Sequence, residues 1–143
     1  MFGEDYILGE APITIDGKGR IILPKFTYIE VDDELVFSKI EVDSCFTIFS
    51  KSQIFKKLST LKSKQENAKT HEEYDLLQRQ IDKIQNCCFG ISKADKQHRI
   101  LLPNSLRESL VSENKLYING GLALQIPCVH AYKDKTLINK KGK

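Results

Sequence analysis

Two short segments of this chain follow one physical pattern, and this duplication constrains the fold more than any other feature. The first segment runs from Asp16 to Pro24 and the second from Asp95 to Pro103. Each has an aspartate, three polar or turn-forming residues, an arginine, three aliphatic residues and a proline. The repeat predicts two copies of one small unit, each holding an acid and an arginine around a tight polar turn.

The length of the chain limits how these copies can be stable. The chain has 143 residues, enough for one compact domain or two very small ones. A unit of about 50 residues buries little apolar surface and is only marginally stable by itself. We therefore expect the copies to pack on each other, to exchange strands and to oligomerise.

The net charge of +3 conceals an uneven distribution along the chain. Residues 1–50 have a net charge of −6, residues 51–86 of +3 and residues 87–143 of +6. Such a distribution suits head-to-tail contacts between copies, or a basic face for an anion. An uneven scatter of solubilising charges explains the same values equally well.

Composition disfavours membrane proteins and secreted proteins. No apolar run reaches the roughly 20 residues that a membrane-spanning helix needs. Residues 1–5 are acidic and lack the basic region and apolar stretch of a signal peptide. We therefore expect a cytoplasmic protein with no membrane partner.

Cysteines and histidines give no pattern for a cofactor or a catalytic centre. The cysteines lack a Cys-x-x-Cys pair and are expected to be small buried thiols; they are Cys45, Cys87, Cys88 and Cys128. No motif pairs a nucleophile with a base, as nucleophilic catalysis requires. His98 is the best candidate for an acid or base, but a solvated or phosphate-contacting role is favoured. We expect no enzymatic activity, no metal, no cofactor and no small-molecule substrate.

Local patterns predict strands in both copies. Alternation of apolar and polar residues predicts a strand over 11–15, and the two glycines that follow predict a turn. Residues 20–23 then return as a second strand of a hairpin, which the next proline ends. Further elements are predicted as strands at 34–38, 45–49, 89–94, 99–102, 116–118 and 128–132 and as a short helix at 104–110.

Two helices are predicted between the copies. Ser50 or Ser52 caps the first helix, residues 63–69 form a bend, and Thr70 begins the second helix with a capping box. The expected fold class is therefore α+β, with two β units and a helical pair between them. The expected boundaries are 1–51, 52–86 and 87–135, followed by a frayed basic tail at 136–143.

The charged turns support two interpretations that the residues leave equally open. Lysines and arginines lie at or beside both hairpin tips, and Lys93 and Arg107 add charge near the second tip. A two-stranded ribbon fits the major groove of B-DNA, where such side chains meet phosphates or guanine edges. Alternatively, Asp16 pairs with Arg20 and Asp95 with Arg99 simply to close the turns.

The two segments, extended in the second copy through Glu108, resemble the paired D-x-x-x-R repeats of the MraZ family of bacterial transcriptional regulators. The resemblance covers nearly the whole chain. It implies two swapped-hairpin units like those of AbrB and SpoVT, assembled into a homo-oligomeric ring of about eight to twelve subunits. It also implies a nucleoid-associated protein that binds double-stranded DNA at short direct repeats upstream of its own division and cell-wall operon, usually as a repressor.

The resemblance assigns Arg20 and its neighbour Lys18 to DNA contact, with Arg99 and Lys96 as their counterparts. His98 stands where the family commonly has glycine, and a position that needs positive φ would strain a histidine. The candidate DNA contacts are Lys18, Arg20, Lys25, Lys93, Lys96, His98 and Arg99. The candidate motif-structural residues are Asp16, Gly17, Gly19, Pro24, Asp95 and Pro103. A protein-interaction or antitoxin-like module of the same fold, without specific DNA binding, is the alternative function.

Overall fold

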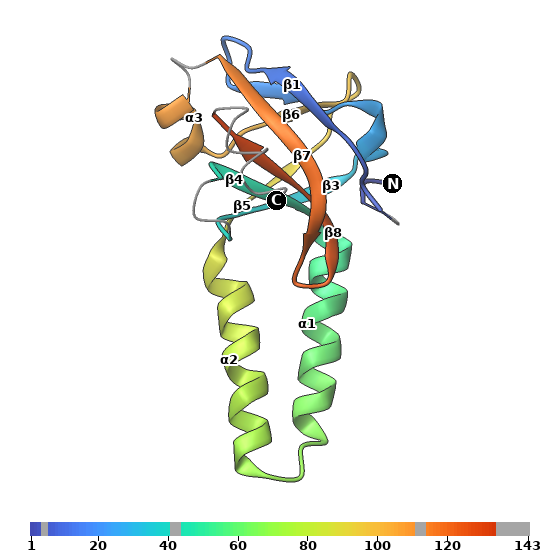
Figure 1. Cartoon of the computed structure of the whole chain (residues 1–143), viewed down its shortest axis with the longest axis vertical. Coiled ribbons are helices and arrows are strands. Elements are labelled where there is room, and N and C mark those ends of the chain that lie inside the picture. The colour runs from blue at the N-terminus through green and yellow to red at the C-terminus, as the bar shows by residue number, and fades with distance from the viewer. Residues whose placement is uncertain (4–5, 41–43, 111–113, 134–143) are drawn as a thin grey trace.

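The computed structural model describes residues 1–3, 6–40, 44–110 and 114–133. A β region occupies one end of the molecule, and a long helical hairpin projects from it (Figure 1). The elements are β1 (Glu10–Thr14), β2 (Arg20–Ile22), the 3₁₀ turn η1 (Lys25–Thr27), β3 (Glu34–Ser38), β4 (Phe46–Ser50), α1 (Lys51–Glu66), α2 (His71–Cys87), β5 (Cys88–Lys93), β6 (Arg99–Leu101), α3 (Asn104–Leu110), β7 (Lys115–Ala123) and β8 (Ile126–Tyr132). The predicted α+β class is confirmed.

Strand pairing joins the two sequence repeats to each other. The larger sheet has six strands in the order β1-β7-β8-β4-β3-β5, and β2 and β6 form a separate two-stranded ribbon. The first copy supplies β1 to β4 and the second supplies β5 to β8, and the antiparallel pairs β1–β7, β2–β6, β3–β5 and β4–β8 all cross between copies. The expected exchange of strands is therefore present within one chain.

The simple hairpin predicted at the first repeat is wrong, because its second strand pairs with a different partner. One bridge joins Ile15 to Ile21, but β2 pairs along its length with β6. The reason is burial: Ile21 and Ile100 lie opposite each other and are 1% and 0% exposed. Joining the two aliphatic strands buries both in one core, which a hairpin of the first copy alone would not do.

Each face of the larger sheet contributes to a different hydrophobic cluster. In β3, Leu35 and Phe37 belong to the cluster that also contains the buried residues of the ribbon. Val36, between them, belongs to the cluster under the helical hairpin, with Ile54 and Ile84. Because side chains alternate along a strand, a strand covered on both faces reads as an unbroken apolar run.

The helical hairpin differs from its prediction at one end of α1. The expected bend at 63–69 is wrong, because α1 continues to Glu66. Gln65 supports this last turn, since its side chain is buried and donates a hydrogen bond of 2.7 Å to Oε1 of Gln78 on α2. The cap at Thr70 is confirmed by a 3.1 Å hydrogen bond from the Glu73 N–H. Ser50 is the N-cap residue of α1 but accepts no capping bond.

The boundaries predicted between units stay a prediction, and residues 136–143 lie outside the described residues. Within the described parts of the chain, neither long helix has the length and apolar character needed to cross a bilayer.

Candidate nucleic-acid interface

The first loop, residues 16–19, is organised by one carboxylate. Oδ1 of Asp16 accepts hydrogen bonds from the backbone N–H groups of Lys18 and Arg20, both at 2.9 Å. Oδ2 accepts a 2.7 Å hydrogen bond from Nε of Arg20. The Gly19 N–H donates to the Asp16 carbonyl at 3.0 Å and closes the turn. Aspartate suits this position because its short side chain reaches backbone groups that lie just ahead in the chain.

The second loop, residues 95–98, has the same network. Oδ1 of Asp95 accepts from the backbone N–H groups of Gln97 and Arg99, both at 2.9 Å. Oδ2 accepts a 2.8 Å bond from Nε of Arg99, and the His98 N–H donates to the Asp95 carbonyl at 2.9 Å. The Asp–Arg pairs expected as turn closures are therefore present in both loops.

These hydrogen bonds also set the ionisation of the two aspartates. The backbone N–H of Arg20 is the main cause that lowers the pKa of Asp16, with a further lowering from the Arg20 side chain. Arg99 acts in the same way, again chiefly through its backbone N–H, to lower the pKa of Asp95. Both carboxylates are therefore charged at neutral pH and hold their arginines in place.

The β2/β6 ribbon turns one face towards solvent. Arg20 lies opposite Leu101 and Ile22 lies opposite Arg99, whereas the central residue of each strand is buried. Side-chain alternation therefore places these four residues on the outer face. The side chains of Arg20 and Arg99 are 25% and 29% exposed. Both arginines can therefore be reached from solvent, although each is paired with an aspartate.

The other candidate contacts are exposed: Lys18, Lys25, Lys93, Lys96 and His98. Because β2 and β6 run antiparallel, the two loops lie at opposite ends of the ribbon, at the end of the molecule away from the helical hairpin tip (Figure 1). Lys93 belongs to an exposed ion pair, in which its Nζ lies 3.8 Å from Oδ1 of Asp32. Pro24 precedes η1 and Pro103 precedes α3.

The two loops differ at their fourth residue. Gly19 has φ +79° and His98 has φ +61°, so both occupy the left-handed region. A Cβ on Gly19 would come 2.5 Å from Cγ of Arg107 on α3, so the close approach of Arg107 requires glycine there. His98 is exposed and belongs to one of the residue types that tolerate this region better than most.

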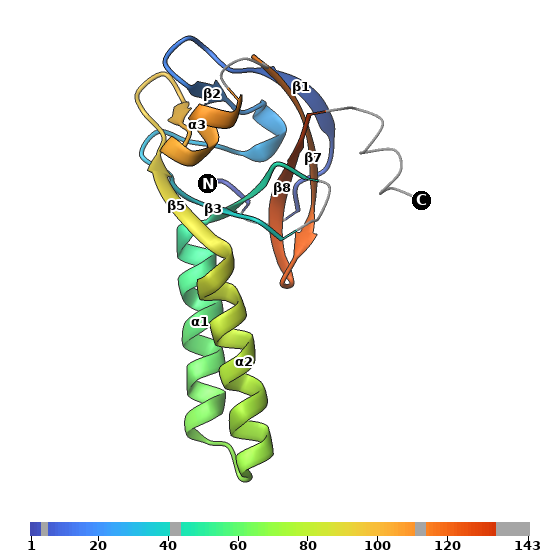
Figure 2. The same ribbon diagram turned by 90° about the vertical axis from the view of Figure 1, so that its left-hand side faces the viewer.

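Arg107 was expected to add charge near the second loop, and the structure places it against the first. The helix α3 follows the second repeat in sequence, but the pairing of β2 with β6 brings it to the other repeat (Figure 2). The sequence did contain a signal for this contact. The glycine occurs only in the first copy, as Gly19, and the arginine occurs only in the second copy, as Arg107. Strand exchange between the copies had to be known before that signal could be interpreted.

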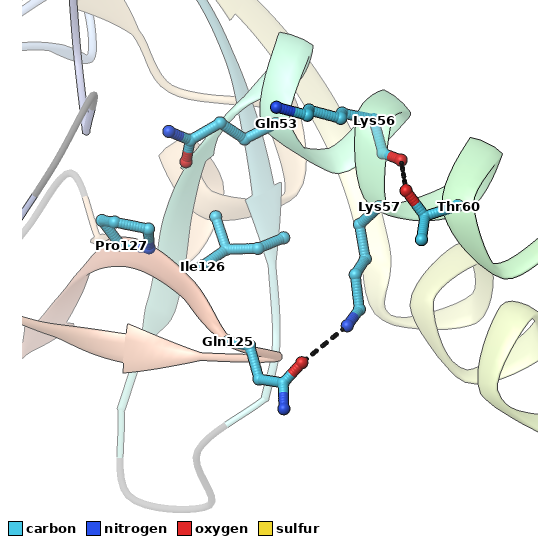
Figure 3. Close-up of a pocket in the computed structure, with 7 residues that line it drawn as sticks. All are labelled: Gln53, Lys56, Lys57, Thr60, Gln125, Ile126 and Pro127. Atoms are coloured by element: carbon cyan, nitrogen blue, oxygen red, sulfur yellow. Dashed lines mark hydrogen bonds between the residues drawn. The ribbon is translucent and has the colours of Figure 1, made fainter.

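A pocket among the described residues includes neither loop. An open pocket of about 270 Å³ lies between α1 and the β7–β8 turn and includes Lys56, Lys57 and Gln125 (Figure 3). Nζ of Lys57 donates a 2.9 Å hydrogen bond to Oε1 of Gln125, so this lysine already has a partner within the chain.

No group of three metal-binding side chains occurs among the described residues. Burial is the main cause that raises the pKa of the Cys88 thiol to about 12, and the neighbouring Cys87 is the second cause. A pKa this high disfavours the reactive thiolate form of Cys88.

Known proteins similar to this chain are transcriptional regulators, although no protein-family model matches it. The protein named transcriptional regulator MraZ from Caldanaerobacter subterraneus subsp. tengcongensis is 30% identical over 117 residues, which are 80% of this chain and 74% of the relative. The proteins of the same name from Thermoanaerobacter pseudethanolicus and Halothermothrix orenii are 31% and 30% identical, over 80% and 79% of this chain and 74% and 73% of the relatives.

Proposed function

The chain belongs to the MraZ family of transcriptional regulators, and we propose that it is a sequence-specific DNA-binding regulator, not an enzyme, whose β2/β6 ribbon contacts the duplex. The finer proposal is that it represses its own division and cell-wall operon by binding short direct repeats upstream of it. Its proposed location is cytoplasmic and nucleoid-associated.

One observation carries this proposal: two matched loops present arginines on the same solvent-facing ribbon. Each arginine is anchored through Nε. In the described part of the chain, the terminal Nη atoms of Arg20 and Arg99 have no partner. A guanidinium that is fixed at one edge and free at the other is preorganised to bind a phosphate or a guanine edge. A two-stranded ribbon also has the width that the major groove accepts.

Affinity is proposed to come from several weak contacts on one oligomer. A single ribbon neutralises few phosphates, so one subunit binds weakly. Spacing several ribbons to match repeated DNA sites multiplies avidity by about 10²–10⁴. The edge strand β5 has a surface suited to association, because Phe89 and Ile91 are exposed beside an apolar groove that includes Val36 and Leu58. A ring of about eight to twelve subunits is the proposed assembly.

Substitution of the two arginines tests this function directly. Binding to a labelled duplex from the upstream region of its own gene is measured by fluorescence anisotropy at several salt concentrations. Arg20→Ala and Arg99→Ala are each expected to weaken binding by about tenfold to a hundredfold, because each removes one anchored contact. Arg79→Ala, on the exposed surface of α2, is the control and should bind normally. Wild-type affinity in both loop variants, with the oligomer intact, would contradict the proposal.

A protein-interaction module without DNA binding is the second candidate. It is favoured by the acidic first third of the chain and by the exposed apolar residues of β5. Under this function the purified chain would show no affinity for any duplex at low salt and would co-purify with a stoichiometric protein partner.

A further inference from the structure

The side chain of Arg107 lies directly on the first loop. Its Cγ and Cδ occupy the space that a Cβ on Gly19 would take. Gly19 is buried, and its carbonyl accepts a 2.9 Å hydrogen bond from the N–H of Leu102, at the start of the segment that leads into α3. Arg107 therefore contacts the first loop by packing, and the backbone bond from Leu102 holds the segment before α3 beside the same loop.

The charged end of Arg107 is poorly compensated within the described chain. Its Nε is buried and has no hydrogen-bond partner. Its Nη2 donates to Oδ1 of Asn104, which is a neutral group. No carboxylate among the described residues lies within ion-pair distance of this guanidinium, whereas Arg20, which directly follows the first loop, is paired with Asp16. A partly buried cation that lacks an anion favours binding one, because a lost hydrogen bond to a charged group is costly.

We propose that Arg107 is a further DNA-contacting residue, which binds a backbone phosphate beside the first loop. This inference rests on the proposed function, since a DNA phosphate is the anion that the loop would meet. Arg107 joins Lys18 and Arg20 as a third cation of the first loop. Because it comes from α3 of the other repeat, a complete first loop requires both copies of the sequence pattern.

The second loop has no equivalent of this residue. The position that matches Arg107 in the first repeat is Tyr28, which is exposed and ends the short turn η1. The position that matches Gly19 is His98. The second loop therefore lacks both the glycine and the arginine that meet at the first loop. The first loop is the stronger phosphate-binding end of the ribbon.

The test separates the charge of Arg107 from its packing. Arg107→Met keeps an unbranched apolar stem against Gly19 and removes the charge. For the full chain and a duplex from its own upstream region, the affinity is expected to fall about five- to tenfold near 0.1 M salt, and the slope of log affinity against log salt is expected to become shallower by about 0.9 per subunit. Arg107→Lys is expected to restore most of that slope, because a point charge still neutralises a phosphate.

Arg79→Met is the matched control, because it removes the same charge from an exposed site on α2 and should leave the slope unchanged. Arg107→Gln, a neutral polar variant, is measured in parallel, and thermal unfolding shows which variants are folded. A wild-type salt slope in either folded neutral variant would overturn the inference. If the wild-type protein binds DNA, Arg20→Ala weakens binding as expected and Arg107→Met leaves both affinity and salt slope unchanged, only the role of Arg107 fails. If the wild type binds no duplex at low salt, the proposed function fails.

Discussion

The two loops of the ribbon have the same internal hydrogen bonds but different surroundings. In both, an aspartate accepts two backbone N–H bonds at 2.9 Å and an arginine Nε bond at 2.7 or 2.8 Å. The first loop is covered by Arg107 of α3, whereas the second ends in an exposed histidine. The comparison shows that an identical local network is compatible with unequal packing, and therefore with unequal roles at the two ends.

The largest effect is expected when the fourth residue of the second loop is copied into the first. In Gly19→His the new side chain would overlap the stem of Arg107, since a Cβ alone already does. Overpacking of this kind costs about 1–3 kcal/mol of unfolding free energy, to be measured by urea denaturation. Gly17→Ala is the control, because a Cβ at that position meets nothing within 4 Å. A loss below about 0.5 kcal/mol for Gly19→His would show that Arg107 does not hold the first loop.

A smaller effect, equal at both loops, is expected from acid. The pKa values of Asp16 and Asp95 are lowered in the folded chain, chiefly by the backbone N–H groups of Arg20 and Arg99. Their stabilising contribution is therefore complete above the ordinary aspartate pKa of about 3.9 and is lost as the pH falls through the lowered values.

NMR titration of the two carboxyls checks this expectation, and both should titrate below the ordinary aspartate value. Asp16→Asn and Asp95→Asn should each reduce the loss of stability in acid, and by similar amounts. Asp75→Asn on α2 is the control. Clearly different effects for the two loop variants would show that the matched networks are not energetically matched.

The smallest effect is expected from His98→Gly. A non-glycine residue with φ near +60° is strained, and His98 has φ +61°. Glycine relieves that strain but makes the unfolded chain more flexible, so the net gain in unfolding free energy should be about 0.5 kcal/mol. Thermal unfolding measures the gain, and a loss of stability would show that the His98 side chain makes a favourable contact.

Features that depend on neighbouring residues could be predicted from the sequence. The Asp16–Arg20 and Asp95–Arg99 pairs, the Thr70 cap and the helix at 104–110 all follow from residues within a few positions of one another. The exposed position of the candidate lysines follows from their charge.

Features that depend on distant parts of the chain could not be predicted. The partner of β2 is decided by which aliphatic strand buries Ile21 most completely, and that strand belongs to the other repeat. The place of Arg107 then follows from that pairing. The end of α1 is set by Gln65 meeting Gln78 across the hairpin, a contact that the polar composition of 63–69 conceals.

The pairing between repeats has a consequence for synthesis of the chain. A ribosome completes β1 long before its partner β7 emerges, although Glu10 must finally lie opposite Asn119. During that delay the nascent strand exposes backbone groups that can pair with other chains. Pro12, in the middle of β1, removes one of those N–H donors. The same proline that this edge strand tolerates in the finished sheet therefore also discourages premature partners during translation.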